Sequence, residues 1–338
     1  MSWSNTHDLT LTPDISAVKR EPIWLSGLTS ALVGLASTAM ILAWPDQQIG
    51  FVEWGYGFEL AIGIGLFSAL LLLLALPTRT QSAWRQTIKQ AGPWLLVLSL
   101  FLFFWELFTA KLAILPAPFF APPQALIHVY ASDWPRILDS LLNSIWLLAN
   151  GVILGSLCGF VTGVSIGWSR HLGYWVHPVL RFLGPIPSTA LLPMAFFFFP
   201  SGWSAAVFLI ALASWFPVTI LTWSGVASVD KAYYDVARTL GAKPAFLIFR
   251  VAIPAALPYV FVGLFMGLGA SFSVLVAAEM MGVKSGLGWY LSWAQGWASY
   301  ANMYGALIVM ALVFSSIISL LFTIRDRVLV WQKGVVQW

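Results

Sequence analysis

Residues 142–168 read LNSIWLLANGVILGSLCGFVTGVSIGW, a stretch of 27 residues without a charged side chain. An α-helix needs about 20 apolar residues to cross the hydrocarbon core of a bilayer, so this stretch predicts a membrane-spanning helix. Glycine recurs in it at every fourth position, as Gly151, Gly155, Gly159, Gly163 and Gly167. Such a ladder lies on one helix face and predicts close packing of another helix in lipid. A substrate groove lined by bare backbone is the alternative interpretation.

Seven further runs of similar length and composition extend the pattern in both directions. They lie approximately at residues 23–44, 57–76, 94–115, 176–199, 205–223, 256–277 and 303–324. Apolar residues make up 59% of the chain and charged residues 9%, whereas soluble domains carry about 25% charged residues. We therefore expect an all-α polytopic membrane protein with about eight transmembrane helices, surrounded by membrane lipid.

The distribution of lysine and arginine predicts the orientation, because these residues are enriched in cytoplasmic loops. If the N-terminus is cytoplasmic, thirteen basic residues fall on the cytoplasmic side and three on the opposite side. The thirteen are Lys19, Arg20, Arg79, Arg85, Lys89, Arg170, Lys231, Arg238, Lys243, Arg250, Arg325, Arg327 and Lys333, and the three are Lys111, Arg136 and Lys284. Both termini are thus predicted to be cytoplasmic.

Composition also argues against several classes of function. The chain has one cysteine, Cys158, and four scattered histidines, so it cannot form an intrachain disulfide and offers no pattern for a metal site. The net charge of +4 is dispersed between apolar runs and forms no basic stripe, which argues against nucleic-acid binding. No clustered His, Cys or carboxylate set points to an enzyme.

The longest polar stretch within the last six runs lies at residues 225–254 and is predicted to be cytoplasmic. It contains the sequence DVARTLG from Asp235 to Gly241, then nine residues, then VAIP ending at Pro254. A short helix after Asp230 would place Asp235 and Arg238 on one face, three residues apart. Pro254 would begin the next membrane helix, where its missing N–H does no harm.

This loop resembles the EAA motif of ABC-importer permeases, which is Glu-Ala-Ala-x-x-x-Gly followed nine residues later by Ile-x-Leu-Pro. The wider resemblance covers residues 94–338 and is to inner-membrane permeases of the nitrate, sulfonate, taurine and bicarbonate class. It rests on short local patterns as well as on the loop. These are Ser144 with the glycine ladder, Pro178, Ile186-Pro187 with Ala190 and Pro193, Trp215-Phe216-Pro217, Ala278-Glu279 and Gly286-Leu287-Gly288.

The resemblance implies a six-helix type I permease core at residues 94–338 that forms the translocation pathway with a second copy of the chain. Two separate ATPase subunits would dock on the loop and use ATP, and an extracytoplasmic binding protein would deliver a small solute at the bacterial inner membrane. The coupling residues that it implies are Asp235, Ala237, Arg238, Gly241, Val251, Ile253 and Pro254. The pathway residues are Pro187, Pro193 and Glu279.

Two positions depart from the resemblance, because Leu147 and Gly184 stand where the family commonly has arginine. They leave open whether the substrate is an anion. Residues 1–93 lie outside the resemblance and form an extension with two predicted spans, which we expect not to be needed for the pathway.

The chain has no Gly-x-x-x-x-Gly-Lys-Ser/Thr loop, so it is predicted to bind no nucleotide or other cofactor of its own. The main alternative is an ion-coupled secondary transporter, in which intramembrane acids such as Glu59, Glu106 or Glu279 would carry the ion.

Overall fold

The computed structural model describes residues 24–47, 55–76, 83–115 and 117–332, and within these ranges every regular element is a helix. Seven helices are long and apolar enough to cross a membrane, and a bent pair could form an eighth span. The expected all-α polytopic fold is therefore confirmed. Both termini, including Lys19, Arg20 and Lys333, and also Arg79, lie outside the described residues.

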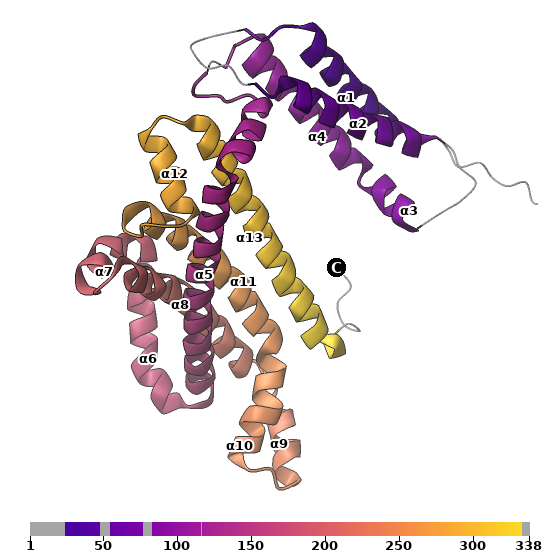
Figure 1. Cartoon of the computed structure of the whole chain (residues 1–338). Coiled ribbons are helices and arrows are strands. Elements are labelled where there is room, and N and C mark those ends of the chain that lie inside the picture. Colours follow the sequence, from indigo (N-terminus) through magenta and orange to yellow (C-terminus); the bar gives the residue numbers. More distant parts are fainter. Residues whose placement is uncertain (1–23, 48–54, 77–82, 116, 333–338) are drawn as a thin grey trace, which may run out of the picture. The chain divides into compact units, whose positions relative to one another are not determined.

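The chain divides into two compact units, residues 1–128 and residues 129–338 (Figure 1). In the first unit, α1 (Leu25–Ala43) packs against α2 (Gly57–Ala75) and against α4 (Gly92–Glu106). The short helix α3 (Ala83–Gln90) precedes α4, and the π-helix η1 (Leu107–Lys111) continues it. The third predicted span, residues 94–115, is thus α4 with η1, and it packs against α1 of the extension.

The second unit is built around α8 (Gly202–Ala227) and α11 (Ile253–Met281), which pack against each other. The long helix α5 (Pro123–Trp168) begins in the first unit and continues through the second, and α13 (Tyr300–Val328) lies beside α12 (Leu287–Gly296). The segment between α8 and α11 forms α9 (Lys231–Thr239), α10 (Pro244–Phe246) and the π-helix η3 (Leu247–Ala252). Figure 1 shows α9 and α10 at one end of this unit and α12 at the other.

The five glycines of the ladder face α8. A Cβ atom added at Gly155 would lie 2.1 Å from the Ala211 carbonyl oxygen, and one at Gly163 would lie 2.7 Å from the Thr219 carbonyl oxygen. Added Cβ atoms at Gly151, Gly159 and Gly167 would likewise meet atoms of α8 closer than van der Waals contact. The helices α5 and α8 therefore pack closely along the whole ladder, with backbone atoms of α8 nearest at Gly155, Gly159 and Gly163.

We expect Gly155→Ala to lower the stability of the second unit, because the added methyl group overlaps a backbone oxygen that cannot rotate away. Overpacking of this kind typically costs about 1–3 kcal/mol. The measurement is the thermal unfolding midpoint in detergent. Gly269→Ala on α11 is the matched control, since an added Cβ there meets nothing within 4 Å. Equal midpoints for the two variants would contradict the tight α5–α8 contact.

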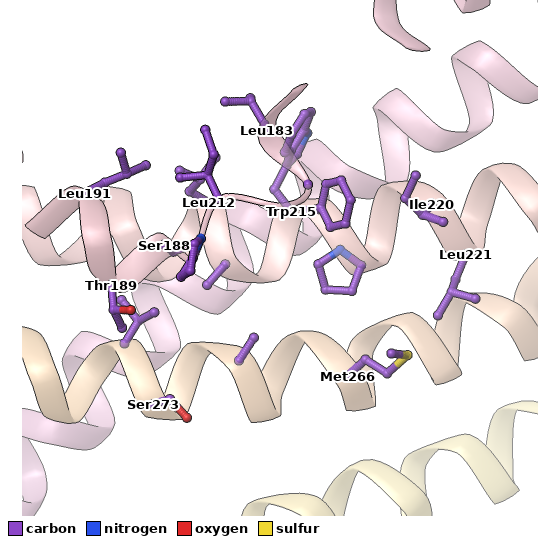
Figure 2. A pocket seen from close by; sticks show the side chains of 18 residues that line it. Leu183, Ser188, Thr189, Leu191, Leu212, Trp215, Ile220, Leu221, Met266 and Ser273 are labelled. Atoms are coloured by element: carbon purple, nitrogen blue, oxygen red, sulfur yellow. The ribbon is translucent and has the colours of Figure 1, made fainter. Parts of the chain in front are cut away.

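The predicted span at residues 176–199 is not one straight helix. It consists of α6 (Arg170–Leu183), the 3-10 helix η2 (Ser188–Leu191) and α7 (Leu192–Phe198), and the chain bends by 84° between α6 and the η2–α7 segment. The bend lies at Gly184-Pro-Ile-Pro187, where two prolines cannot donate backbone hydrogen bonds. Residues on both sides of this break, such as Leu183 and Thr189, are among the side chains drawn in Figure 2.

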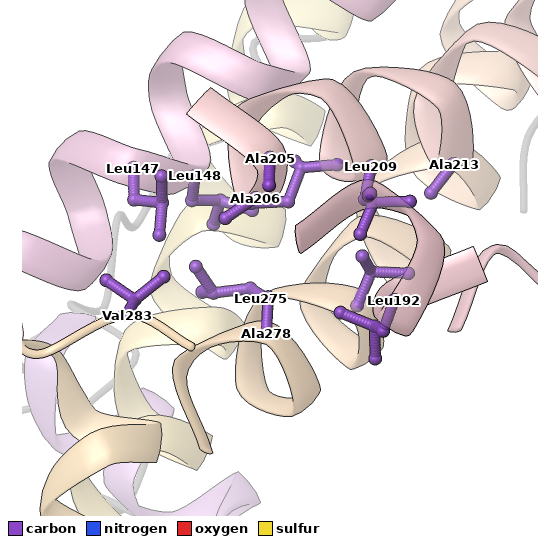
Figure 3. Packing of buried hydrophobic residues seen from close by; sticks show 13 residues of the cluster. Leu147, Leu148, Leu192, Ala205, Ala206, Leu209, Ala213, Leu275, Ala278 and Val283 are labelled. Carbon is purple, nitrogen blue, oxygen red and sulfur yellow. The ribbon is translucent and has the colours of Figure 1, made fainter. Parts of the chain in front are cut away.

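A hydrophobic core holds the broken segment against the long helices. Figure 3 shows Leu192 of α7 near Leu209 of α8 and Leu275 of α11, with Leu147 and Leu148 contributed by α5. Leu147, one of the two positions that depart from the family pattern, is 1% exposed and belongs to this core. A leucine there packs between helices, which a charged arginine could not do without a buried partner.

Candidate functional site

A cavity of about 500 Å³ lies at the break between α6 and α7. Its walls come from the break itself, from the middle of α8 and from α11 (Figure 2). The lining residues are Leu183, Gly184, Ile186, Pro187, Ser188, Thr189, Leu191, Leu212, Ala213, Trp215, Phe216, Pro217, Ile220, Leu221, Met266, Ala270, Ser273 and Val274. Discontinuous membrane helices commonly form substrate sites in transporters, so this cavity is the candidate solute site.

The three residues predicted for the pathway lie in different places. Pro187 lines the cavity, whereas Pro193 and Glu279 do not belong to its lining. Pro193 stands in the first turn of α7, where its fixed φ suits a helix start. Trp215 and Phe216, which the sequence analysis used only as a family pattern, lie in the cavity wall.

Glu279 is fully buried near the end of α11 and joins three segments of the second unit. Its carboxylate accepts hydrogen bonds of 2.7 Å each from the Ser144 hydroxyl of α5 and from the backbone N–H of Gly288. The Ser144 hydroxyl in turn accepts a bond of 2.8 Å from the backbone N–H of Leu287. This arrangement anchors the start of α12 to α5 and α11.

A second polar cluster, not found by sequence reasoning, joins α12 to α5 and α13. Tyr290 donates its hydroxyl proton to Asp133 at 2.7 Å, and Asn302 donates to both residues, at 3.2 Å to Asp133 and 2.6 Å to Tyr290. Burial, together with Asp133, raises the pKa of Tyr290, so the phenol stays protonated and keeps donating. Asp133 lies 157 residues from Tyr290 in the chain, so no local spacing connects it to the other two residues.

The predicted short helix after Asp230 is present as α9. The Asp230 side chain caps it by accepting a hydrogen bond from the backbone N–H of Ala232 at 2.9 Å. Asp235 and Arg238 form an exposed pair with 3.4 Å between carboxylate oxygen and guanidinium nitrogen. Pro254 stands in the first turn of α11, as expected.

The end of α9, the segment that follows it and the first part of η3 form an open groove of about 700 Å³. Its lining is mainly apolar and includes two basic residues: Ala237, Leu240, Gly241, Ala242, Lys243, Ala245, Phe246, Phe249 and Arg250. Leu240 is 83% exposed and Phe249 is 67% exposed. Large apolar side chains gathered on a projecting loop mark an interaction surface.

Of the seven predicted coupling residues, Ala237 and Gly241 line this groove, and Asp235 and Arg238 lie on the exposed helix beside it. Val251, Ile253 and Pro254 belong to the junction of η3 and α11. Among the described residues, no three His, Cys, Asp or Glu side chains gather closely enough to hold a metal ion.

Gly241 follows α9 with a positive φ of 82°, and its N–H bonds to the carbonyl of Arg238 at 2.9 Å. Glycine and asparagine tolerate this conformation, whereas alanine is strained in it. We therefore expect Gly241→Asn to retain more ATP-dependent solute uptake than Gly241→Ala, measured at matched membrane levels. Greater activity of the alanine variant would show that the size of the side chain, rather than the backbone angle, restricts this position.

Comparison with known proteins places the chain in a family. Residues 151–329 match the family described as binding-protein-dependent transport system inner membrane component. A probable ABC transporter permease protein of Brucella abortus is 31% identical over 59% of this chain and 86% of its own length. The putative aliphatic sulfonates transport permease protein SsuC of Bacillus subtilis is 30% identical over 59% of this chain and 72% of its own.

The nitrate import permease protein NrtB of Synechococcus elongatus is 29% identical over 62% of this chain and 79% of its own. Among solved structures, the inward-facing MetNI methionine ABC transporter matches with a TM-score of 0.45 and 18% identity, over 55% of this chain and 95% of the matched chain. The predicted resemblance to ABC-importer permeases is confirmed. The chain belongs to the family of binding-protein-dependent transport system inner membrane components.

Proposed function

We propose that this chain forms, with a second copy, the translocation pathway of an ATP-driven importer. ATPase subunits dock on the groove at residues 237–250, and an extracytoplasmic binding protein delivers the solute to the opposite face. The observation that carries the proposal is the exposed apolar groove on a loop whose spacing matches the family's coupling motif. In this proposal the partner subunits hydrolyse ATP, and this chain contributes the pathway and the docking groove.

The orientation follows from the basic residues. Lys243 and Arg250 line the groove, and Lys231 and Arg238 belong to α9, so the concentration of positive charge supports a cytoplasmic position for this end of the second unit. The ATPase subunits of an importer are cytoplasmic, as the proposal requires. With this loop inside, α12 lies on the extracytoplasmic side, where a binding protein delivers its solute.

The substrate is proposed to be a small solute of the kind handled by the sulfonate and nitrate permeases to which the chain is similar. It would pass the cavity at the α6–α7 break during transport. The chain functions at the bacterial inner membrane.

Docking on the groove is tested by Leu240→Asp. This change places a charge in a contact that must exclude water, and an unpaired charge in such a contact costs several kcal/mol. We expect the ATPase of the same importer to be lost from the tagged permease during purification from the membrane. Val330→Asp is the matched control, because Val330 is also an exposed apolar residue but lies outside the groove. Retention of the ATPase by Leu240→Asp would refute docking here.

The alternative of an ion-coupled transporter requires an acid that is free to load and release an ion. Glu279 is engaged by Ser144 and Gly288, and Glu106 lies in a cluster with Lys111 and Gln124. The carboxylates of Glu106 and Glu279 hold helices together, which argues against an ion carrier at these two positions, and Glu59 lies exposed in the first turn of α2. Uptake that persists in vesicles without ATP but with an ion gradient would favour the alternative.

A further inference from the structure

The cavity at the α6–α7 break contains no charged side chain in its lining. Its polar side chains are three hydroxyl groups, since the indole N–H of Trp215 donates to Thr162 outside the lining at 3.3 Å, and the remaining lining is apolar, aromatic or backbone. Ligand sites of about 300–1,000 Å³ commonly combine such an apolar wall with a few orienting polar groups. The volume of about 500 Å³ falls in this range.

The hydroxyl groups lie toward one end of the cavity, where Leu191 also lines it (Figure 2). Figure 2 shows the hydroxyl groups of Thr189 and Ser273 toward one end, and Ile220, Leu221 and Met266 toward the other, with Trp215 between them. An amphipathic molecule could place its polar end at the hydroxyl groups and its body against the indole and the aliphatic side chains. A compact inorganic ion would leave most of this wall uncontacted.

Gly184 leaves room for the aromatic ring of Phe216 in the cavity wall at the break. A Cβ atom at this position would lie 2.5 Å from Cζ of the Phe216 ring, so the ring occupies the space next to the bare backbone. Any larger residue at position 184 would displace the ring from the cavity wall. The glycine therefore supports an apolar surface where the chain bends.

We propose that the transported solute is a small organic molecule with an apolar body at least as large as a benzene ring and one polar end. The cavity binds the body against Trp215 and Phe216, and the hydroxyl groups of Ser188, Thr189 and Ser273 bind the polar end. This inference deepens the proposed function and rests on it, because it takes the cavity to be part of the solute pathway.

The test compares two probes with the same polar end, benzenesulfonate and methanesulfonate, by saturation-transfer NMR on the full-length chain in lipid nanodiscs. This method detects weak binding, and empty nanodiscs correct for partition into lipid. We expect a signal for benzenesulfonate and none for methanesulfonate. Ala270→Trp fills the cavity and should abolish the benzenesulfonate signal, whereas Leu157→Trp, on an exposed part of α5 outside the lining, should preserve it.

Equal signals for the two probes, or a benzenesulfonate signal that survives Ala270→Trp, would overturn the proposal. It is also overturned if benzenesulfonate gives no signal, or if Ala270→Trp converts a dimer to a monomer, because a second copy then covers this surface. Co-purification of the ATPase is measured on the same samples. Retained ATPase together with failed probe binding rejects this solute class alone, whereas absent ATPase in the wild type rejects the proposed function.

Discussion

Replacing Lys111 with methionine is expected to destabilise the first unit more than any other single change at a lysine of the described chain. The Lys111 side chain is 1% exposed, and its ammonium group donates to the carbonyl oxygens of Ile41 and Trp44 and to the carboxylate of Asp46, the last two at 2.5 Å. These carbonyls lie at the C-terminal end of α1, where a positive charge also complements the helix dipole. Lys111 therefore ties η1 to the end of α1.

Loss of the ammonium group leaves Glu106 buried without its nearest positive charge, which lies 3.9 Å away. Breaking a buried ion pair typically costs about 3–5 kcal/mol, and the lower end applies here because Asp46 is partly exposed. The measurement is the thermal unfolding midpoint in detergent, with the exposed Lys284→Met as control. Similar midpoints for the two variants would show that the cluster contributes little.

The contacts of α1 with α4 and with Lys111 bear on whether residues 1–93 can be removed. A chain that begins near Gln90 would lack α1, and with it the Ser30 hydroxyl that bonds to Ser99 at 2.8 Å and the three acceptors of Lys111. From the sequence, residues 1–93 were expected not to be needed for the pathway. The packing of α4 against α1 instead predicts that such a truncated chain is unstable, even if the pathway lies elsewhere.

The positions of the membrane spans could be predicted from the sequence because lipid imposes a length on every apolar run. The span at residues 57–76 corresponds to α2 almost residue for residue. The run at residues 142–168 marks only the second part of the 46-residue helix α5, because its first part carries Asp133, Arg136 and Asp139. Hydropathy detects the apolar part of a helix and does not detect polar helical turns that extend beyond that part.

Long-range polar contacts could not be predicted. Lys111 was close enough in sequence to suggest Glu106 as a partner, yet its shortest carboxylate contact is with Asp46, 65 residues away. The break at Gly184–Pro187 was hidden because apolar residues continue through it. Two prolines within three residues were the available signal, since each removes a backbone donor from the helix.

Substitution of Glu279 is expected to have the second large effect on folding and uptake. Two variants distinguish a role as an anchor between helices from a role in the pathway. Alanine at this position would leave the Ser144 hydroxyl and the Gly288 N–H buried without an acceptor, at about 1–3 kcal/mol for each unsatisfied group. We expect Glu279→Ala to lose folded protein in the membrane, measured by fluorescence-detected gel filtration, and to lose uptake with it.

Glutamine keeps most of these contacts, because its amide oxygen accepts from Gly288 and its amide nitrogen can donate to the Ser144 hydroxyl oxygen, so that only the Ser144 O–H proton loses its acceptor. If Glu279 is an anchor, we expect Glu279→Gln to keep both folded protein and uptake. Gly286→Ala should lose folded protein and uptake, as Glu279→Ala does. The reason for the second expectation is that an added Cβ at Gly286, whose φ is 110°, would lie 2.2 Å from the carboxylate oxygen of Glu279. Normal folding of Glu279→Gln with loss of uptake would instead show that its charge acts in the pathway, as the family resemblance implied.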